Sequence, residues 1–145
     1  MASVSESIRI DRPVEVVFEF LDDPRNHAEI TPSLATVGGI EPLENGGKRV
    51  EHTYEMVGIS LHGVLVERVH EKHERMVFEM DGDLTGEIEI TFENDDGGTT
   101  VTYSAAYDLP GRVLSKLAAP VIRRYNRREL SKTLANLRAS LEAGS

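Results

Sequence analysis

The sequence predicts an α+β fold in which an antiparallel sheet of about six to seven strands packs against a long C-terminal helix, with two short helices after the first strand. Three features predict it. Two short helical stretches follow an extended N-terminal segment, alternating apolar and polar residues fill the middle of the chain, and a leucine-rich helical segment closes it. The 145 residues are expected to form one domain, residues 1–145, because a chain of this length buries most of its apolar surface unaided.

The N-terminal segment is expected to form a strand followed by two helices. Except at Glu6, the stretch VSESIRID places its aliphatic side chains on one face: Val4, Ile8 and Ile10. In DRPVEVVFEFLDDP, Asp11 is the expected N-cap of the first helix and Pro24 its expected stop. The stretch RNHAEITP is expected to form the second helix, which closes before Pro32.

From there to Pro110 the pattern predicts one strand after another. The expected inward sets are Val50, His52, Tyr54 and Met56; Met76, Phe78 and Met80; Ile88, Ile90 and Phe92; and Val101, Tyr103, Ala105, Tyr107 and Leu109. The stretch ISLHGVLVERV is also extended but apolar on both faces, so its inward set stays open. Short turns such as NDDGG predict antiparallel neighbours that bury one face of the sheet.

The last segment, from Gly111 to about Ala143, is predicted to form a short helix, a break near Pro120 and a long helix. One broad apolar face contains Leu114, Leu117, Val121, Ile122 and Tyr125. A second face, rotated from the first, contains Leu130, Leu134, Leu137 and Leu141. We expect this leucine stripe to dock on the sheet, because a helix of this kind buries its apolar side.

The net charge of −9 is unevenly distributed, since residues 97–145 carry +5 and residues 1–96 carry −14. The run IRRYNRREL contributes four arginines that share an arc of about 140° on the helical wheel: Arg123, Arg124, Arg127 and Arg128. Tyr125 falls on the opposite, buried side, whereas a nucleic-acid binder interleaves exposed aromatic residues with its basic ones. We therefore expect no nucleic-acid partner and a solvated arginine face balanced by the acidic remainder of the chain.

Composition excludes several classes of protein. No stretch approaches the ~20 apolar residues of a membrane span, and the opening MASVSESIRI lacks the basic and apolar regions of a signal peptide. A cytoplasmic protein without stable membrane insertion is expected. The absence of cysteine excludes a thiol nucleophile and a zinc–thiolate site. No nucleophile elbow or phosphate-binding loop is present, so no catalytic residue and no cofactor is predicted.

Stretches at both ends of the chain resemble one superfamily. IRIDRPVEVVFEFLDDPRN resembles the opening of the SRPBCC (START-like) superfamily, particularly its polyketide cyclase/dehydrase-like branch, and GGTTVTYSAAYDLPG and LSKTLANLRASLEA are similar to its late strand and helical tail. The resemblance implies a helix-grip fold, with a curved sheet around the C-terminal helix and a hydrophobic cavity between them. One departure occurs in AEITPSL, where Ile30 replaces the tryptophan that many members carry.

Together with the inward sets, this resemblance predicts a protein that binds a small hydrophobic molecule, such as a lipid, an isoprenoid or a polyketide-like compound. The expected lining of the cavity is His52, Tyr54, Met56, Phe78, Met80, Tyr103, Tyr107 and Tyr125. Polar groups among apolar walls are typical of ligand sites, and methionine adapts to irregular ligands. The sequence leaves the oligomeric state open.

Two other functions are compatible with the same residues. In a cyclase/dehydrase-type enzyme, His52 with Tyr54 or Tyr103 would act as the acid–base group, although His52 also fits a hydrogen-bonded core histidine. In a partner-binding protein, the arginine face would contact an acidic protein. The pair His70 and His73 in HEKH is expected at a solvated turn, and no metal site is predicted, because spacing provides no third ligand.

Overall fold

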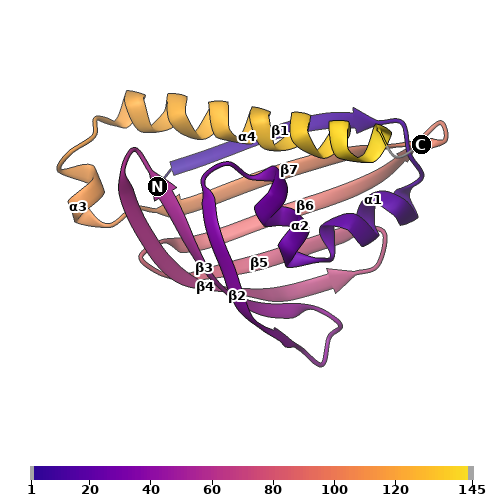
Figure 1. Ribbon diagram of the computed structural model, residues 1–145, viewed down its shortest axis with the longest axis horizontal. Coiled ribbons are helices and arrows are strands. Elements are labelled where there is room, and N and C mark those ends of the chain that lie inside the picture. The colour runs from indigo at the N-terminus through magenta and orange to yellow at the C-terminus, as the bar shows by residue number, and fades with distance from the viewer. Residues whose placement is uncertain (1, 144–145) are drawn as a thin grey trace.

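The computed structural model describes residues 2–143, and its strands form one antiparallel sheet in the order β1-β7-β6-β5-β4-β3-β2 (Figure 1). The strands are β1 (Ala2–Ile10), β2 (Leu34–Pro42), β3 (Lys48–Met56), β4 (Ile59–Glu71), β5 (Arg75–Gly82), β6 (Thr85–Asp95) and β7 (Gly98–Asp108). Strands from β2 onward pair with their neighbours in sequence, and β1 pairs with β7. The predicted α+β helix-grip arrangement with seven strands is therefore confirmed.

The helices α1 (Val14–Leu21) and α2 (Pro24–Ile30) follow β1 as predicted. The predicted N-cap of α1 is wrong, because the chain becomes helical only after Pro13, beyond the reach of Asp11, and no side chain caps this helix. Pro24 does more than stop α1. It is the first residue of α2, where its missing N–H costs no helical hydrogen bond, and the Asp23 carboxylate accepts a backbone N–H of that first turn.

The C-terminal segment forms α3 (Gly111–Leu114) and α4 (Ala119–Glu142), so the predicted break is present. Pro120 lies in the first turn of α4 rather than between two helices. The first predicted apolar face is only partly correct. Ile122 is buried, but Leu114 is 57% and Val121 47% exposed. Leu114 lies on α3, before the break, so it does not share one helical wheel with the residues of α4.

The apolar stripe of α4 docks on the sheet, as predicted, and Figure 1 shows α4 running alongside β1. Its buried residues are Ile122, Leu130, Leu134, Leu137 and Leu141, none more than 6% exposed. They join one core cluster with the inward side chains of the strands and with Val17, Phe18 and Leu21 of α1. Each buried leucine stabilises the fold by about 2 kcal/mol.

A β-bulge in β4 determines which of its side chains face inward. The pairing of β4 with β5 shifts between Glu67 and Val69, so Arg68 is the extra residue on the bulged strand. Residues three apart lie on opposite faces of a regular strand. Here the bulge places Glu67 and His70 on the same face, where they pair with inward residues of β5. Both side chains therefore belong to the inward set of β4, which the sequence left open.

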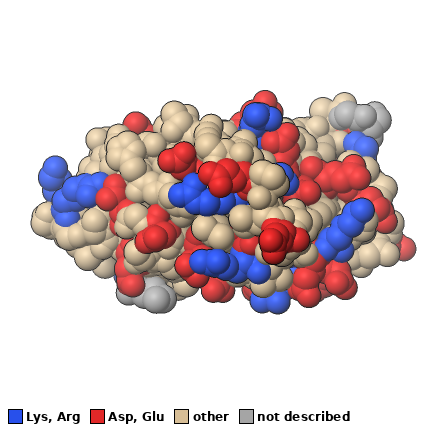
Figure 2. Space-filling view, turned by 90° about the horizontal axis from the view of Figure 1, so that it is seen from below, with Lys and Arg blue, Asp and Glu red and all other residues tan. Residues whose placement is uncertain are grey.

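The arginine face of α4, formed by Arg123, Arg124, Arg127 and Arg128, is exposed to solvent as predicted. Within residues 2–143, none of these arginines forms a salt bridge, so the expected balance with the acidic remainder is not made by direct ion pairs. Seen from the side away from α4, Figure 2 shows acidic side chains spread over the surface with basic ones between them.

Among the described residues, no helix is long and apolar enough to cross a membrane.

We expect the leucine stripe to control the stability of the fold. The substitution Leu137→Ala, at a residue that is 1% exposed, should lower the free energy of unfolding by about 3 kcal/mol, because it leaves a cavity in the core. Urea denaturation followed by circular dichroism measures this change. The matched control is Leu114→Ala, the same substitution at an exposed position, which should change stability by less than about 0.5 kcal/mol. Equal losses in both variants would contradict the docking of α4.

Candidate functional site

A cavity of about 100 Å³ lies between the sheet and the first half of α4. It has room for several water molecules, because one water needs roughly 10–15 Å³ of such volume. Apolar atoms form most of its wall, and the aliphatic and methionine side chains that contribute them include Met56, Met80, Leu84, Ile88 and Leu130. Space is left because Ala105 of β7 stands between two tyrosines, where a larger side chain would fill the gap.

All four tyrosines of the chain line this cavity: Tyr54, Tyr103, Tyr107 and Tyr125. Burial raises the pKa of Tyr54 to about 12 and raises the pKa values of Tyr103 and Tyr107 above their usual range. These hydroxyls therefore stay protonated at neutral pH and serve as hydrogen-bond donors or acceptors. The Tyr125 hydroxyl donates to the backbone carbonyl of Glu55 at 2.9 Å, which connects α4 to the end of β3.

The cavity also contains a carboxylate, that of Glu129 on α4. Its Oε1 lies 4.0 Å from the Lys132 ammonium, and the side chain is 15% exposed. The other oxygen, Oε2, is buried and has no hydrogen-bond partner among the described residues. Leaving a buried acceptor unpaired costs about 1–3 kcal/mol, so a hydrogen-bond donor on a bound molecule would relieve this cost.

A second, smaller cavity of about 40 Å³ lies between α1, α2 and the sheet. It shares wall residues with the larger one, among them Tyr54, Ile88 and Tyr103. Tyr54 and Tyr103 therefore border both cavities. A change in the orientation of either ring would alter the volume on both sides.

The structure brings most of the residues predicted to line the cavity to one place. The larger cavity is lined by Tyr54, Met56, Met80, Tyr103, Tyr107 and Tyr125. Phe78 lines the smaller cavity instead, beside the His27 ring at a centroid distance of 6.2 Å. His52 lines neither. Binding of a ligand by these residues stays a prediction.

His52 is buried behind the wall of the cavity, with 5% of its surface exposed. Its ring packs edge-on against Tyr54 at a centroid distance of 4.9 Å and lies over Gly63, where an added Cβ would come within 3.3 Å of the ring. Burial lowers the pKa of His52 to about 4. The ring is therefore neutral at pH 7, but its Nδ1 has no partner among the described residues, unlike that of a fully hydrogen-bonded core histidine.

Sequence reasoning missed two polar residues of α4 that face the cavity, Glu129 and Thr133. A third, Asn126, fits two roles from the sequence, contact with a ligand or capping of the helix break, and it lines the cavity. The signal that could have identified them is their spacing. Asn126, Glu129 and Thr133 recur at intervals of three and four residues and flank Leu130, so they share the buried face of the helix. Among the 25 acidic residues of the chain, Glu129 did not stand out without this criterion.

The expected strand-to-strand turn at HEKH is present between β4 and β5, but its two histidines are not solvated. The His70 side chain is only 12% exposed, and the rings of His70 and His73 both contact Phe18 edge-on, at centroid distances of 5.4 and 5.5 Å. The physical reason is the bulge at Arg68, which turns His70 toward the core. His70 therefore belongs to the interior of the protein.

Comparison with known proteins supports the resemblance noted in the sequence. The family model described as "Polyketide cyclase / dehydrase and lipid transport" matches residues 1–142. A search of the curated proteins gives no match. The SRPBCC resemblance, and its polyketide cyclase branch, is thereby confirmed.

Solved structures share the fold at low sequence identity. A Thermus thermophilus protein is 19% identical with a TM-score of 0.80, and the match covers 99% of each chain. A START superfamily protein from Mycobacterium smegmatis is 13% identical with a TM-score of 0.77, again over 99% of each chain. The Zhui aromatase/cyclase from a Streptomyces species is 14% identical with a TM-score of 0.71, over 99% of this chain and 98% of that one.

The buried, neutral His52 makes stability depend on pH. Its pKa is about 4 in the folded protein and 6.5 in a model peptide, so below pH 6.5 the unfolded chain binds the proton first and gains stability. We expect the free energy of unfolding to fall by about 2 kcal/mol, because of this group, as the pH falls from about 6.5 to 4. Urea unfolding of the wild type and His52→Phe at several pH values measures it. The stability of His52→Phe relative to the wild type should increase toward low pH. Equal pH dependence of the two unfolding free energies would contradict a buried, neutral His52.

Proposed function

Because the chain belongs to the polyketide cyclase/dehydrase and lipid transport family, we propose that it binds a small, mainly hydrophobic molecule in the larger cavity between the sheet and α4. One observation carries the proposal. An apolar cavity is lined by all four tyrosines and by a Glu129 oxygen that has no hydrogen-bond partner within residues 2–143. Apolar walls with a few convergent polar groups are the usual composition of a small-molecule site.

The polar groups specify the kind of ligand that fits. Glu129 Oε2 is an acceptor without a donor in the described structure, so it would pair with a hydroxyl or N–H group of the ligand. The Tyr103 and Tyr107 hydroxyls stay protonated and would donate to a carbonyl or ether oxygen. The ligand is therefore an apolar molecule with at least one hydrogen-bond donor, such as a hydroxylated lipid, isoprenoid or polyketide.

The size of the cavity limits this ligand. Pockets for drug-sized molecules measure roughly 300–1,000 Å³, whereas this cavity measures about 100 Å³. A larger ligand would have to displace side chains. Met56 and Met80 are suited to this, because an unbranched thioether side chain changes rotamer at low cost, and movement of Tyr54 or Tyr103 would join the second cavity to the first.

The cavity is tested by filling it. The substitution Ala105→Leu adds bulk inside the cavity and should weaken binding of the apolar dye anilinonaphthalene sulfonate, followed by its fluorescence, by about tenfold, since it removes volume without changing charge. Native mass spectrometry of the protein from its own host should show a retained small molecule that is lost in this variant.

The matched control is Ala106→Leu. Ala106 is the next residue on β7, and its side chain points to the outer face of the sheet, so this variant should bind the dye and retain the small molecule like the wild type. Equal binding by both variants would overturn the proposal, as would loss in both.

A second candidate is a cyclase/dehydrase-type reaction in the same cavity. The observation that favours it is again Glu129, a carboxylate among hydroxyls that can accept a proton from a bound substrate. The position of His52 outside the cavity and its lowered pKa favour Glu129 over His52 for this role.

The two candidates predict different effects of Glu129→Gln. An enzyme with Glu129 as its general base should lose a factor of about 10²–10⁴ in kcat toward a poly-β-ketone substrate, with little change in KM, because proton transfer typically contributes that much. A carrier should instead bind its ligand about tenfold more weakly and show no turnover in either form. Single-turnover kinetics together with ligand titration separate these outcomes, and an unchanged variant would exclude both roles of Glu129.

A further inference from the structure

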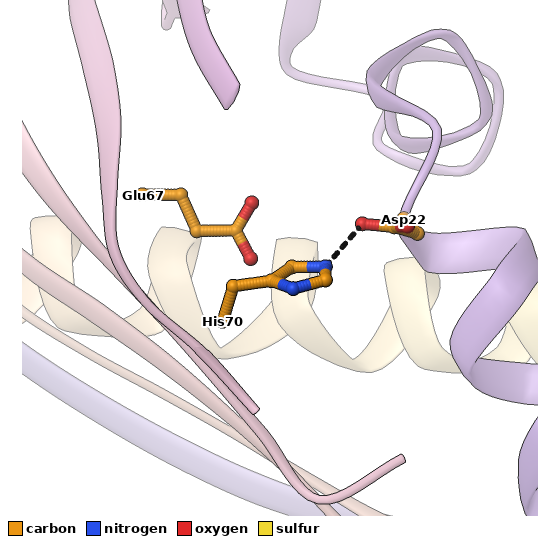
Figure 3. A group of neighbouring side chains, drawn as sticks. All are labelled: Asp22, Glu67 and His70. Carbon is orange, nitrogen blue, oxygen red and sulfur yellow. Dashed lines mark hydrogen bonds and ion pairs between the residues drawn. The ribbon is translucent and has the colours of Figure 1, made fainter. Parts of the chain in front are cut away.

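A second group of titratable side chains lies away from the larger cavity, where the end of α1 meets β4. Asp22 follows the last turn of α1, and Glu67 and His70 come from β4 on the two sides of the bulge. Each residue offers one possible ligand atom, and these three atoms lie within 4.8 Å of one another. Figure 3 shows the three side chains converging from the helix and the strand on one point.

Glu67 is the unusual member of this group. It is 2% exposed, and its Oε1 accepts the backbone N–H of Lys48 at 3.2 Å. Its Oε2 is buried and has no hydrogen-bond partner among the described residues, and in Figure 3 the carboxylate points toward His70 and Asp22. Burial raises the pKa of Glu67 to about 7. A buried carboxylate oxygen without a proton donor, directed at two other ligand-type side chains, requires a positive partner or a proton.

The histidine is held in the orientation that a ligand needs. His70 Nε2 lies 2.9 Å from Asp22 Oδ1, and the ring is fixed by its edge-on contact with Phe18. Zinc binds imidazole nitrogen and carboxylate oxygen at about 2.0–2.2 Å. Two ligand atoms 2.9 Å apart can therefore bind the same ion with little movement, the ion replacing the proton between them.

Space for the Glu67 carboxylate is built into the neighbouring backbone. A Cβ at Gly47 would lie 2.8 Å from Glu67 Cβ and 2.9 Å from its carboxyl carbon, so any larger residue there would displace the acid. The smaller cavity reaches the same point, since Asp22, Lys48 and Glu67 are part of its wall. An ion at the cluster would therefore have an open side facing this cavity.

We propose that Asp22, Glu67 and His70 bind a divalent transition-metal ion of the Zn²⁺ type, with one coordination position open toward the smaller cavity. One imidazole and two carboxylates favour ions such as Zn²⁺, Mn²⁺ or Fe²⁺ over Mg²⁺ and Ca²⁺, which prefer oxygen ligands alone. Three protein ligands leave a fourth tetrahedral position for water or for an oxygen of a bound molecule. The site does not depend on the proposed function of the larger cavity.

Lys48 opposes the ion and provides a discriminating variant. Its ammonium donates to the Asp22 carbonyl oxygen at 2.8 Å and lies 3.4 Å from Asp22 Oδ1. A fixed positive charge this close lowers the affinity for a cation. Removing it by Lys48→Met should therefore tighten metal binding. If Asp22, Glu67 and His70 formed only an ion-pair network with Lys48, the same substitution would instead weaken that network.

The test is calorimetric titration of the intact protein with Zn²⁺ at neutral pH in about 0.15 M salt, which screens diffuse binding to the acidic surface. We expect saturable binding of one ion per chain, with Mg²⁺ at least about tenfold weaker. Glu67→Gln and His70→Ala should each weaken Zn²⁺ binding by about 100-fold or more, beyond the 10–100-fold effect of residues that only support a ligand. Lys48→Met should strengthen it by about tenfold.

The matched controls are Glu71→Gln and His62→Ala, which remove an acid and a histidine from exposed positions of the same strand and should bind Zn²⁺ like the wild type. A measurement on the unaltered protein avoids dependence on the folding of variants: Co²⁺ should develop d–d absorption bands that Zn²⁺ abolishes. Absence of saturable binding, or equal binding by Glu67→Gln and the wild type, would overturn the proposal. Either result would leave the predictions for the larger cavity unaffected.

Discussion

The contact between α4 and the sheet is the constraint on which the rest of this structure depends. Beyond Thr133, α4 presents leucines to the sheet, and the core there is filled. Up to that point the same helical face presents Asn126, Glu129 and Thr133, and the sheet opposite them presents tyrosines around Ala105. One helix therefore closes the core at one end and leaves a polar-edged cavity at the other. A uniform leucine stripe would have given a packed core and no site.

Apart from Tyr125 on α4, the parts of the site that the sequence predicted are those on regular strands. On β5 and β7 strict alternation holds, so Met80, Tyr103 and Tyr107 were placed on the inward face correctly. Alternation gives the face but not the direction in which a side chain leans, which is why His52 shares the face of Tyr54 and yet packs over Gly63, away from the cavity.

The cluster of Asp22, Glu67 and His70 was not predicted from the sequence, for two physical reasons. The bulge in β4 breaks the period of two, so Glu67 and His70 lie together although their spacing assigns them to opposite faces. Their partner Asp22 comes from a helix end about 45 residues earlier, a proximity that only tertiary packing produces. The fold was predictable for the opposite reason, since the order of elements follows from local patterns and turn residues, and antiparallel neighbours in sequence pair directly.

The arginine face has a consequence for the mechanics of α4. Arg123 and Arg127, like Arg124 and Arg128, are one turn apart, and like charges at this spacing destabilise a helix by about 0.2–0.5 kcal/mol per pair. The first turn of α4 has no capping side chain and no acidic residue. The half of the helix that covers the cavity is therefore held by its contacts with the sheet and by the Tyr125 hydrogen bond to β3, with little support from its own sequence. We therefore expect local unfolding of α4 to begin above the cavity and to leave the leucine-anchored half in place.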